Sequence, residues 1–222
     1  MLEKALEDLQ NKVRKAAFLA EGMVNKAIKA LKERKGELAR EVIEKDEEEL
    51  DLLDLEITED VIRIFARYQP KARDLRMTLA IFNITRHLER IGDHAVNIAE
   101  YTLDLVDKPL VKPLIDIPRM AQIASEMLKD SINAFMGGDA EEALRVIERD
   151  NEVDNLLEQV RRELITHMVS NSSTIDRGLK LTSIARNLER IADLATNIAE
   201  EAVFLEKGKI IKHTKSWQEP EK

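Results

Sequence analysis

The chain has 222 residues, a formal net charge of −8 and no cysteine. This composition excludes disulfides, thiolate metal sites and a cysteine nucleophile, and an acidic chain whose only basic run is its short C-terminal end is not expected to bind nucleic acid. The first residues are charged throughout, and no apolar run approaches the roughly 20 residues of a membrane span, so we expect a soluble, cytoplasmic protein.

Long helical patterns separated by glycine or proline predict six helices and no strand. In chain order, they cover approximately residues 2–34, 37–68, 70–106, 118–137, 139–169 and 173–208. Pro70 is placed in the first turn of the third helix. Asp139 with Glu142, and Ser173 with Asp176, are expected to cap the fifth and sixth helices.

A stretch within the third helix occurs twice. Residues 86–100, RHLERIGDHAVNIAE, return as residues 186–200, RNLERIADLATNIAE, and only four of the fifteen positions differ. The likeness extends upstream, where Val42-Ile43-Glu44-Lys45 resembles Val146-Ile147-Glu148-Arg149. Such a repeat indicates an internal duplication, and short connections make neighbouring helices antiparallel.

The predicted fold is therefore all-α, with two tandem, antiparallel three-helix bundles. Residues 1–107 form the first bundle and residues 118–208 the second. Three prolines near residues 108–117 mark the connection between them, and residues 209–222 are expected to be a flexible tail.

Each copy of the repeat carries a Glu and an Asp four residues apart on the polar side of an amphipathic helix. A second acidic pair with the same spacing lies on the helix before it. The four pairs are Glu47 with Asp51, Glu89 with Asp93, Asp150 with Asp154, and Glu189 with Asp193. The two pairs of each half lie about 20 residues before and after a tight turn, so they should reach the same height on adjacent helices.

Four carboxylates at one height repel one another, and a hard cation with oxygen ligands would balance them. Because the pairs lie off the centre of the apolar stripes, we expect any such metal site at the surface. The alternative is a solvated salt-bridge network with Arg86, Arg90, Arg186 and Arg190. On the second helix, the ligand remains open between Asp46 and Glu47.

No catalytic constellation is visible in the sequence. A Glu-x-x-His pattern, a Gly-rich phosphate loop and a Ser-His-Asp order are all missing, so we expect a non-enzymatic protein without an organic cofactor.

Three motifs together resemble the PhoU family of phosphate-transport accessory regulators over nearly the whole chain. They are the duplicated Leu-Glu-Arg-Ile-(Gly/Ala)-Asp, the stretch Val42-Ile43-Glu44-Lys45-Asp46, and Gln69-Pro70 followed by Arg73-Asp74-Leu75-Arg76. The resemblance implies two three-helix bundles whose acidic pairs hold multinuclear iron or zinc at the surface, with Mg or Ca not excluded.

The resemblance also implies a negative regulator of phosphate-starvation signalling. Its partners would be the ATPase subunit of a phosphate ABC transporter and a sensor histidine kinase, and the chain would reach the membrane only through them. We also expect a homo-oligomer. The alternative function is a metal-free helical scaffold or a co-chaperone-like protein-binding module.

Overall fold

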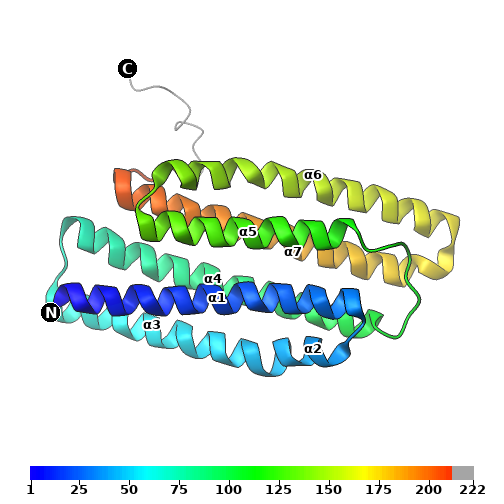
Figure 1. Cartoon of the computed structure of the whole chain (residues 1–222), viewed down its shortest axis with the longest axis horizontal. Coiled ribbons are helices and arrows are strands. Elements are labelled where there is room, and N and C mark those ends of the chain that lie inside the picture. Colours follow the sequence, from blue (N-terminus) through cyan, green and yellow to red (C-terminus); the bar gives the residue numbers. More distant parts are fainter. Residues whose placement is uncertain (212–222) are drawn as a thin grey trace, which may run out of the picture.

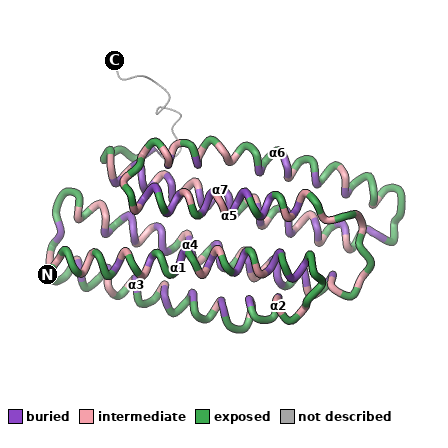
Figure 2. The backbone as a smooth tube through the Cα atoms, viewed as in Figure 1, coloured by how far each residue is buried: buried purple, intermediate pink, exposed green. Residues whose placement is uncertain are grey.

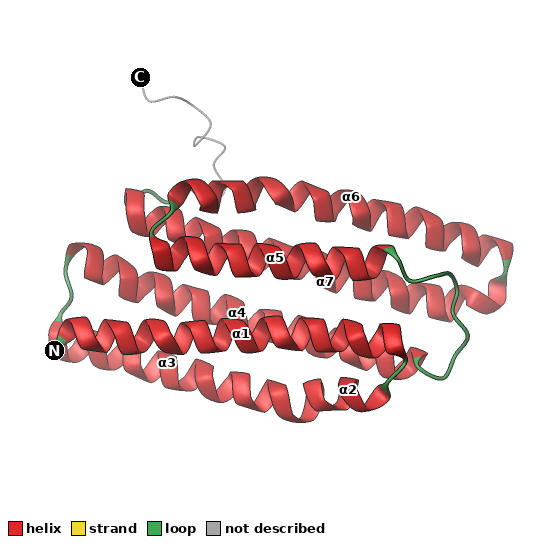
Figure 3. Ribbon diagram, in the orientation of Figure 1, coloured by secondary structure: helices red, strands yellow, loops and turns green. Residues whose placement is uncertain are grey.

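The computed structural model describes residues 1–211, which contain six long helices and no strand, as the sequence predicts (Figure 3). The helices are α1 (Leu2–Glu33), α2 (Gly36–Glu41) continuing through a π-helical turn (Val42–Asp46) into α3 (Glu47–Tyr68), α4 (Ala72–Leu105), α5 (Asp116–Gly137), α6 (Ala140–Ser170) and, after a 3₁₀ turn (Ser172–Thr174), α7 (Ile175–Lys207). Within the described part of the chain, no helix is both long enough and apolar enough to cross a membrane.

The helices form two antiparallel bundles that lie side by side along the long axis of the molecule (Figure 1). The first bundle contains α1, α2–α3 and α4, and the second contains α5, α6 and α7. The two repeat helices, α4 and α7, pack against each other, and α1 packs against α5. Consequently, α3 and α6 are the outermost helices at opposite edges of the molecule.

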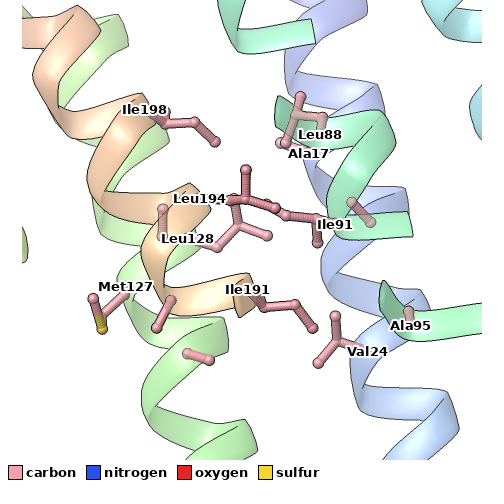
Figure 4. Close-up of a cluster of buried hydrophobic side chains, with 14 of the residues drawn as sticks. Ala17, Val24, Leu88, Ile91, Ala95, Met127, Leu128, Ile191, Leu194 and Ile198 are labelled. Atoms are coloured by element: carbon pink, nitrogen blue, oxygen red, sulfur yellow. The ribbon is translucent and has the colours of Figure 1, made fainter. Parts of the chain in front are cut away.

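The apolar core runs through both bundles without a break (Figure 4). Leu88 and Ile91 of α4 point toward Ile191 and Leu194 of α7, and all four side chains are at most 3% exposed. Burial of an aliphatic side chain of this size stabilises a fold by about 1.5–3 kcal/mol. Because the apolar side of each repeat helix is used in this contact, its polar side faces outward, next to α3 or α6.

Polar contacts fix how the two bundles meet. His94 Nδ1 lies 2.9 Å from Asn187 Oδ1, and both residues stand at positions where the two copies of the repeat differ. Further along the same interface, Asn83 Nδ2 donates to Glu201 Oε1 at 3.1 Å, and Lys180 Nζ lies 2.6 Å from Asp104 Oδ2. The copies have therefore diverged at the seam between them.

The start of α6 agrees with the predicted cap only in part. The Asp139 carboxylate accepts hydrogen bonds from the backbone N–H groups of Glu141 and Glu142. The Glu142 carboxylate does not complete a capping box, because it binds Arg145 instead.

The predicted cap of α7 by Ser173 and Asp176 is wrong. A 3₁₀ turn precedes α7, and the side chain of Asn171 accepts a hydrogen bond from the Ser173 backbone N–H at its start. Asp176 instead forms an ion pair with Lys108 Nζ at 2.8 Å. Pro70 also precedes its helix, since α4 begins at Ala72.

The chain after α7 is described only for a few residues. Gly208 ends α7 in the left-handed conformation, with φ of 64°. Ile210 is exposed, whereas Ile211 is buried. Residues 212–222 of the expected tail lie outside the described residues.

The π-helical turn accommodates one extra residue in the first half. Val42 matches Val146 at an offset of 104, whereas Asp51 matches Asp154 at an offset of 103. A helix absorbs a single inserted residue by widening one turn. Asp46 is thereby buried, where it binds Lys26 Nζ at 2.6 Å.

The same turn decides which residue begins the first acidic pair. Glu47 occupies the position that corresponds to Asp150 at the offset of 103, and its pKa responds to the charge of Asp51. Asp46 is held by Lys26 and does not join the pair.

Gly92 allows α3 to approach α4 closely. A Cβ atom at Gly92 would lie 2.5 Å from Leu50 Cδ2, which is too close for carbon atoms. The second half has Ala192 at the position of Gly92 and Val153 at the position of Leu50. The first half thus has one more side-chain carbon on the outer helix, and the second half has one more on the repeat helix. The total side-chain volume at this contact is conserved.

We expect Gly92→Ala to lower the free energy of unfolding by about 1 kcal/mol, because overpacking costs about 1–3 kcal/mol and the gain in helix propensity returns about 1. Adding Leu50→Val, which copies the second half, should recover most of this loss. Urea denaturation of both single variants and the double variant would measure the coupling. Strictly additive losses would contradict the proposed contact.

Candidate functional site: two surface groups of carboxylates

The structure brings the predicted acidic pairs together in two groups. The first acidic group contains Glu47 and Asp51 of α3 with Glu89 and Asp93 of α4, and the second contains Asp150 and Asp154 of α6 with Glu189 and Asp193 of α7. All eight side chains are exposed or half-buried, and none belongs to the core. Each group therefore lies at the surface, along the junction between an outer helix and a repeat helix.

The carboxylates of the first acidic group influence one another across α3 and α4. Burial is the largest effect that raises the pKa of Glu47, followed by the charges of Asp51 and Asp93. Burial and then Asp93 likewise raise the pKa of Glu89. The pKa of Asp93 is also raised, first by burial, although His94 opposes the shift. The group is held together in spite of its own repulsion.

The second acidic group shows the same effect more strongly. Burial raises the pKa of Asp150 to about 7, and the charges of Asp193, Asp154 and Glu189 add to the shift. Asp150 Oδ1 and Glu189 Oε2 are both buried without a hydrogen-bond partner. Buried carboxylate oxygens normally have a partner, so Asp150 Oδ1 is available to a proton or a cation.

The arginines neutralise only part of this charge. Arg190 Nη1 lies 3.0 Å from Asp193 Oδ2, and its Nε lies 3.5 Å from Glu189 Oε2. In residues 1–211, neither Arg86 nor Arg90 forms an ion pair with the first acidic group. The predicted salt-bridge alternative thus accounts for two carboxylates of the second group.

Sequence reasoning missed Asp54, which belongs with the first acidic group. Asp54 follows Asp51 by three residues on α3, and its charge raises the pKa of Glu89. Its Oδ1 atom is buried without a hydrogen-bond partner. The spacing of residues 47, 51 and 54 along one helix face could have identified it, whereas the second half has Leu157 at this position.

A cleft of about 460 Å³ opens between α6 and α7 beside the second acidic group. Its lining consists of Asp154, Leu157, Glu158, Arg161, Thr182, Arg186, Glu189 and Arg190. Three acidic and three basic side chains make this lining neutral overall. In the first half, Phe82 replaces Thr182 and Asp54 replaces Leu157. The two acidic groups therefore have different surroundings, despite the repeat.

The donor chemistry of both groups is that of a hard-cation site, since every side chain offers carboxylate oxygens. The buried oxygens of Asp54 and Asp150 that lack a hydrogen-bond partner fit the same interpretation. However, no three acidic or histidine side chains among residues 1–211 are arranged as a metal-binding cluster. The carboxylates are neighbours, but they do not form a preassembled ligand shell.

The raised pKa of Asp150 predicts a pH-dependent stability. Because the folded state holds this proton more tightly, the cost of ionising Asp150 is absent near its ordinary pKa, grows as the pH rises, and is complete above pH 7. We expect Asp150→Asn to raise the free energy of unfolding at pH 8 by about 1 kcal/mol, since water screens a half-exposed group, and to have a smaller effect at pH 5.

Thermal unfolding at both pH values would measure this difference. Glu152→Gln, at an exposed position on the same helix, is the matched control and should change little at either pH. An Asp150→Asn effect that is equal at pH 5 and pH 8 would refute the assignment.

Known proteins are similar to this chain in architecture and in sequence. A model of the PhoU domain matches residues 13–102 and 117–202. The phosphate-specific transport system accessory protein PhoU homolog of Aquifex aeolicus is 43% identical over 212 residues, with 96% of each chain covered. A second such homolog, from Thermotoga maritima, is 37% identical over 96% of this chain and 90% of its own.

Solved structures agree with these relatives. The crystal structure of PhoU from Pseudomonas aeruginosa superposes with a TM-score of 0.90 at 32% identity, covering 94% of this chain and all of that one. The phosphate transport system regulatory protein PhoU from Streptococcus pneumoniae gives a TM-score of 0.88 at 27% identity, covering 96% of this chain. The two PhoU domain matches coincide with the two bundles, and this chain belongs to the PhoU family.

Proposed function

We propose that this chain is a non-enzymatic regulatory adaptor of phosphate uptake. In this proposal, it binds the ATPase subunit of a phosphate ABC transporter and a sensor histidine kinase, and it holds phosphate-starvation signalling off when phosphate is plentiful. It works in the cytoplasm and reaches the membrane only through these two partners.

The observation that carries this proposal is the similarity over the whole chain to proteins named as accessory to phosphate-specific transport. The architecture supports it. Two elongated bundles expose long helices, which are suited to protein contacts, and the outer helices of the two halves differ in charge. Two different surfaces on one molecule are what an adaptor with two partners needs.

We further propose that the two acidic groups bind cations, with iron or zinc in more than one copy per chain. Glu89 and Asp93, with Glu47 and Asp51, would hold the ions of the first group. Asp150, Asp154, Glu189 and Asp193 would hold those of the second. Burial first and mutual repulsion second raise the pKa values of Glu89 and Asp150, and a cation beside them would favour the ionised carboxylates.

The metal proposal is tested by loading the purified protein with Fe²⁺ or Zn²⁺, removing the excess and measuring the metal content. We expect more than one ion per chain. Glu89→Gln with Asp93→Asn should remove the ions of the first group only, and Glu189→Gln with Asp193→Asn those of the second.

The matched control for this experiment is Glu48→Gln with Glu59→Gln, because these exposed acidic residues of α3 lie outside both groups. If the site variants retain the metal content of the parent, the chain is a metal-free adaptor. That outcome would leave the proposed protein partners untouched.

The adaptor proposal predicts that the tagged chain co-purifies with the transporter ATPase subunit or the kinase from phosphate-replete cells. Deletion of its gene should switch on phosphate-starvation genes even in high phosphate, which transcript measurements would show. A deletion strain that still represses these genes would count against the proposal.

A further inference from the structure

The outer side of α3 carries an exposed apolar stripe. Its positions alternate at intervals of four and three residues, which is the spacing of a heptad seam, and they are residues 48, 52, 55, 59 and 62. These residues are Glu48, Leu52, Leu55, Glu59 and Ile62, and we call them the outer α3 face. Leu52, Leu55 and Ile62 are 55%, 60% and 61% exposed.

No element among residues 1–211 covers Leu52, Leu55 or Ile62 on the outer α3 face. This face lies on the side of α3 opposite Leu53, Ile57 and Val61, which are buried in the core. Figure 2 shows α3 at one edge of the molecule, with many exposed residues along the helix. Three large aliphatic side chains are thus presented to solvent in a row.

The second half shows that the fold does not need this stripe. Helix α6 occupies the equivalent outer position, and the residues that match the outer α3 face are Asn151, Asn155, Glu158, Arg162 and Ile165. Four of these five residues are polar. An outer helix of this bundle is therefore stable with a polar outer side, and folding does not explain the leucines of α3.

Charge distinguishes the two outer helices as well. Residues 47–62 contain eight acidic residues and no Lys or Arg, whereas the matching residues 150–165 contain five acidic residues and two arginines. Some of the α3 charge is balanced inside the bundle, where Lys12 Nζ binds Glu56 at 2.9 Å and Asp60 at 2.8 Å. Glu48 and Glu59 lie within the stripe and form no ion pair in residues 1–211.

From this pattern, we propose that the outer α3 face docks one amphipathic helix of a partner protein. The partner helix would place apolar side chains against Leu52, Leu55 and Ile62, with Lys or Arg opposite Glu48 and Glu59. The inference rests on the proposed adaptor function, since it supplies a surface for one of the two partners. A seam with this spacing favours a helix that crosses at a shallow angle.

Charge argues against two other occupants. Two copies of this chain paired through the outer α3 face would set acidic residues against each other, and like charges across a helix seam are unfavourable. An anionic membrane surface would repel an acidic helix in the same way. A basic helix is the occupant that satisfies both the apolar stripe and its flanking carboxylates.

The first test transplants the α6 residues onto α3. Leu52→Asn with Leu55→Glu copies Asn155 and Glu158, and the variant should keep its melting temperature because these residues are already tolerated on α6. Co-purification of the transporter ATPase subunit or the kinase should fall by about tenfold or more, since apolar anchors dominate such interfaces. Unchanged capture of both would overturn the docking site.

The second test identifies the occupant. A photo-crosslinking amino acid at Leu55 in the full-length protein, in its native cells, should capture a partner whose linked peptide is basic and amphipathic. The same probe at Glu158 is the matched control and should not capture it. The proposal would be overturned by crosslinks to lipid, to a second copy of the chain or to an acidic segment. It would also be overturned by equal capture from both positions or by no capture at all.

The two tests separate this inference from the proposed function. If neither the transporter subunit nor the kinase associates with the parent protein, the adaptor proposal fails. Capture of a basic helix from another protein at residue 55 would still establish the docking site. If the parent protein binds its partners and residue 55 captures none, the docking site alone fails.

Discussion

The apolar contact between α4 and α7 is the constraint on which the rest of the structure depends. Leu88 and Ile91 meet Ile191 and Leu194 in a core that both bundles share. Because this contact buries the apolar side of each repeat helix, the polar side of that helix lies at the outward junction with α3 or α6. The position of both acidic groups at the surface follows from where the hydrophobic seam lies.

Repulsion and burial within the two acidic groups lower the stability of the folded state locally. Raised pKa values at Glu89, Asp93 and Asp150 arise from burial first and from neighbouring carboxylates second. Each group is nevertheless anchored to two long helices whose apolar sides are fully buried, so repulsion among a few half-exposed charges cannot separate the helices. Stability is supplied by the core, which leaves the outward face free for interactions with ions or partners.

Equivalent helix contacts in the two halves are formed by different residues. Gly92 beside Leu50 corresponds to Ala192 beside Val153, which exchanges one methyl group between helices. Each half also ties its first helix to its second with an ion pair, Lys26 with Asp46 in the first half and Asp130 with Arg149 at 3.1 Å in the second. Such compensating changes preserve the shape of each bundle. On the outer faces, the halves differ in polarity and charge.

Sequence by itself determined the all-α class, the six long helices and the duplication, because helical periodicity and repeated motifs are local properties of the chain. It also placed the four acidic pairs, since height along antiparallel helices follows from counting residues to a turn. The choice of Glu47 over Asp46 required the structure, which shows Asp46 in the widened turn at residues 42–46, where it is buried and binds Lys26.

Only the tertiary structure showed that Asn171 caps the 3₁₀ turn before α7, that Asp54 joins the first acidic group, and that Leu52 and Leu55 of α3 are exposed. These features depend on which helices become neighbours and which sides stay in water. Periodicity predicts that a helix has an apolar side, but the packing of two bundles against each other decides which side is buried.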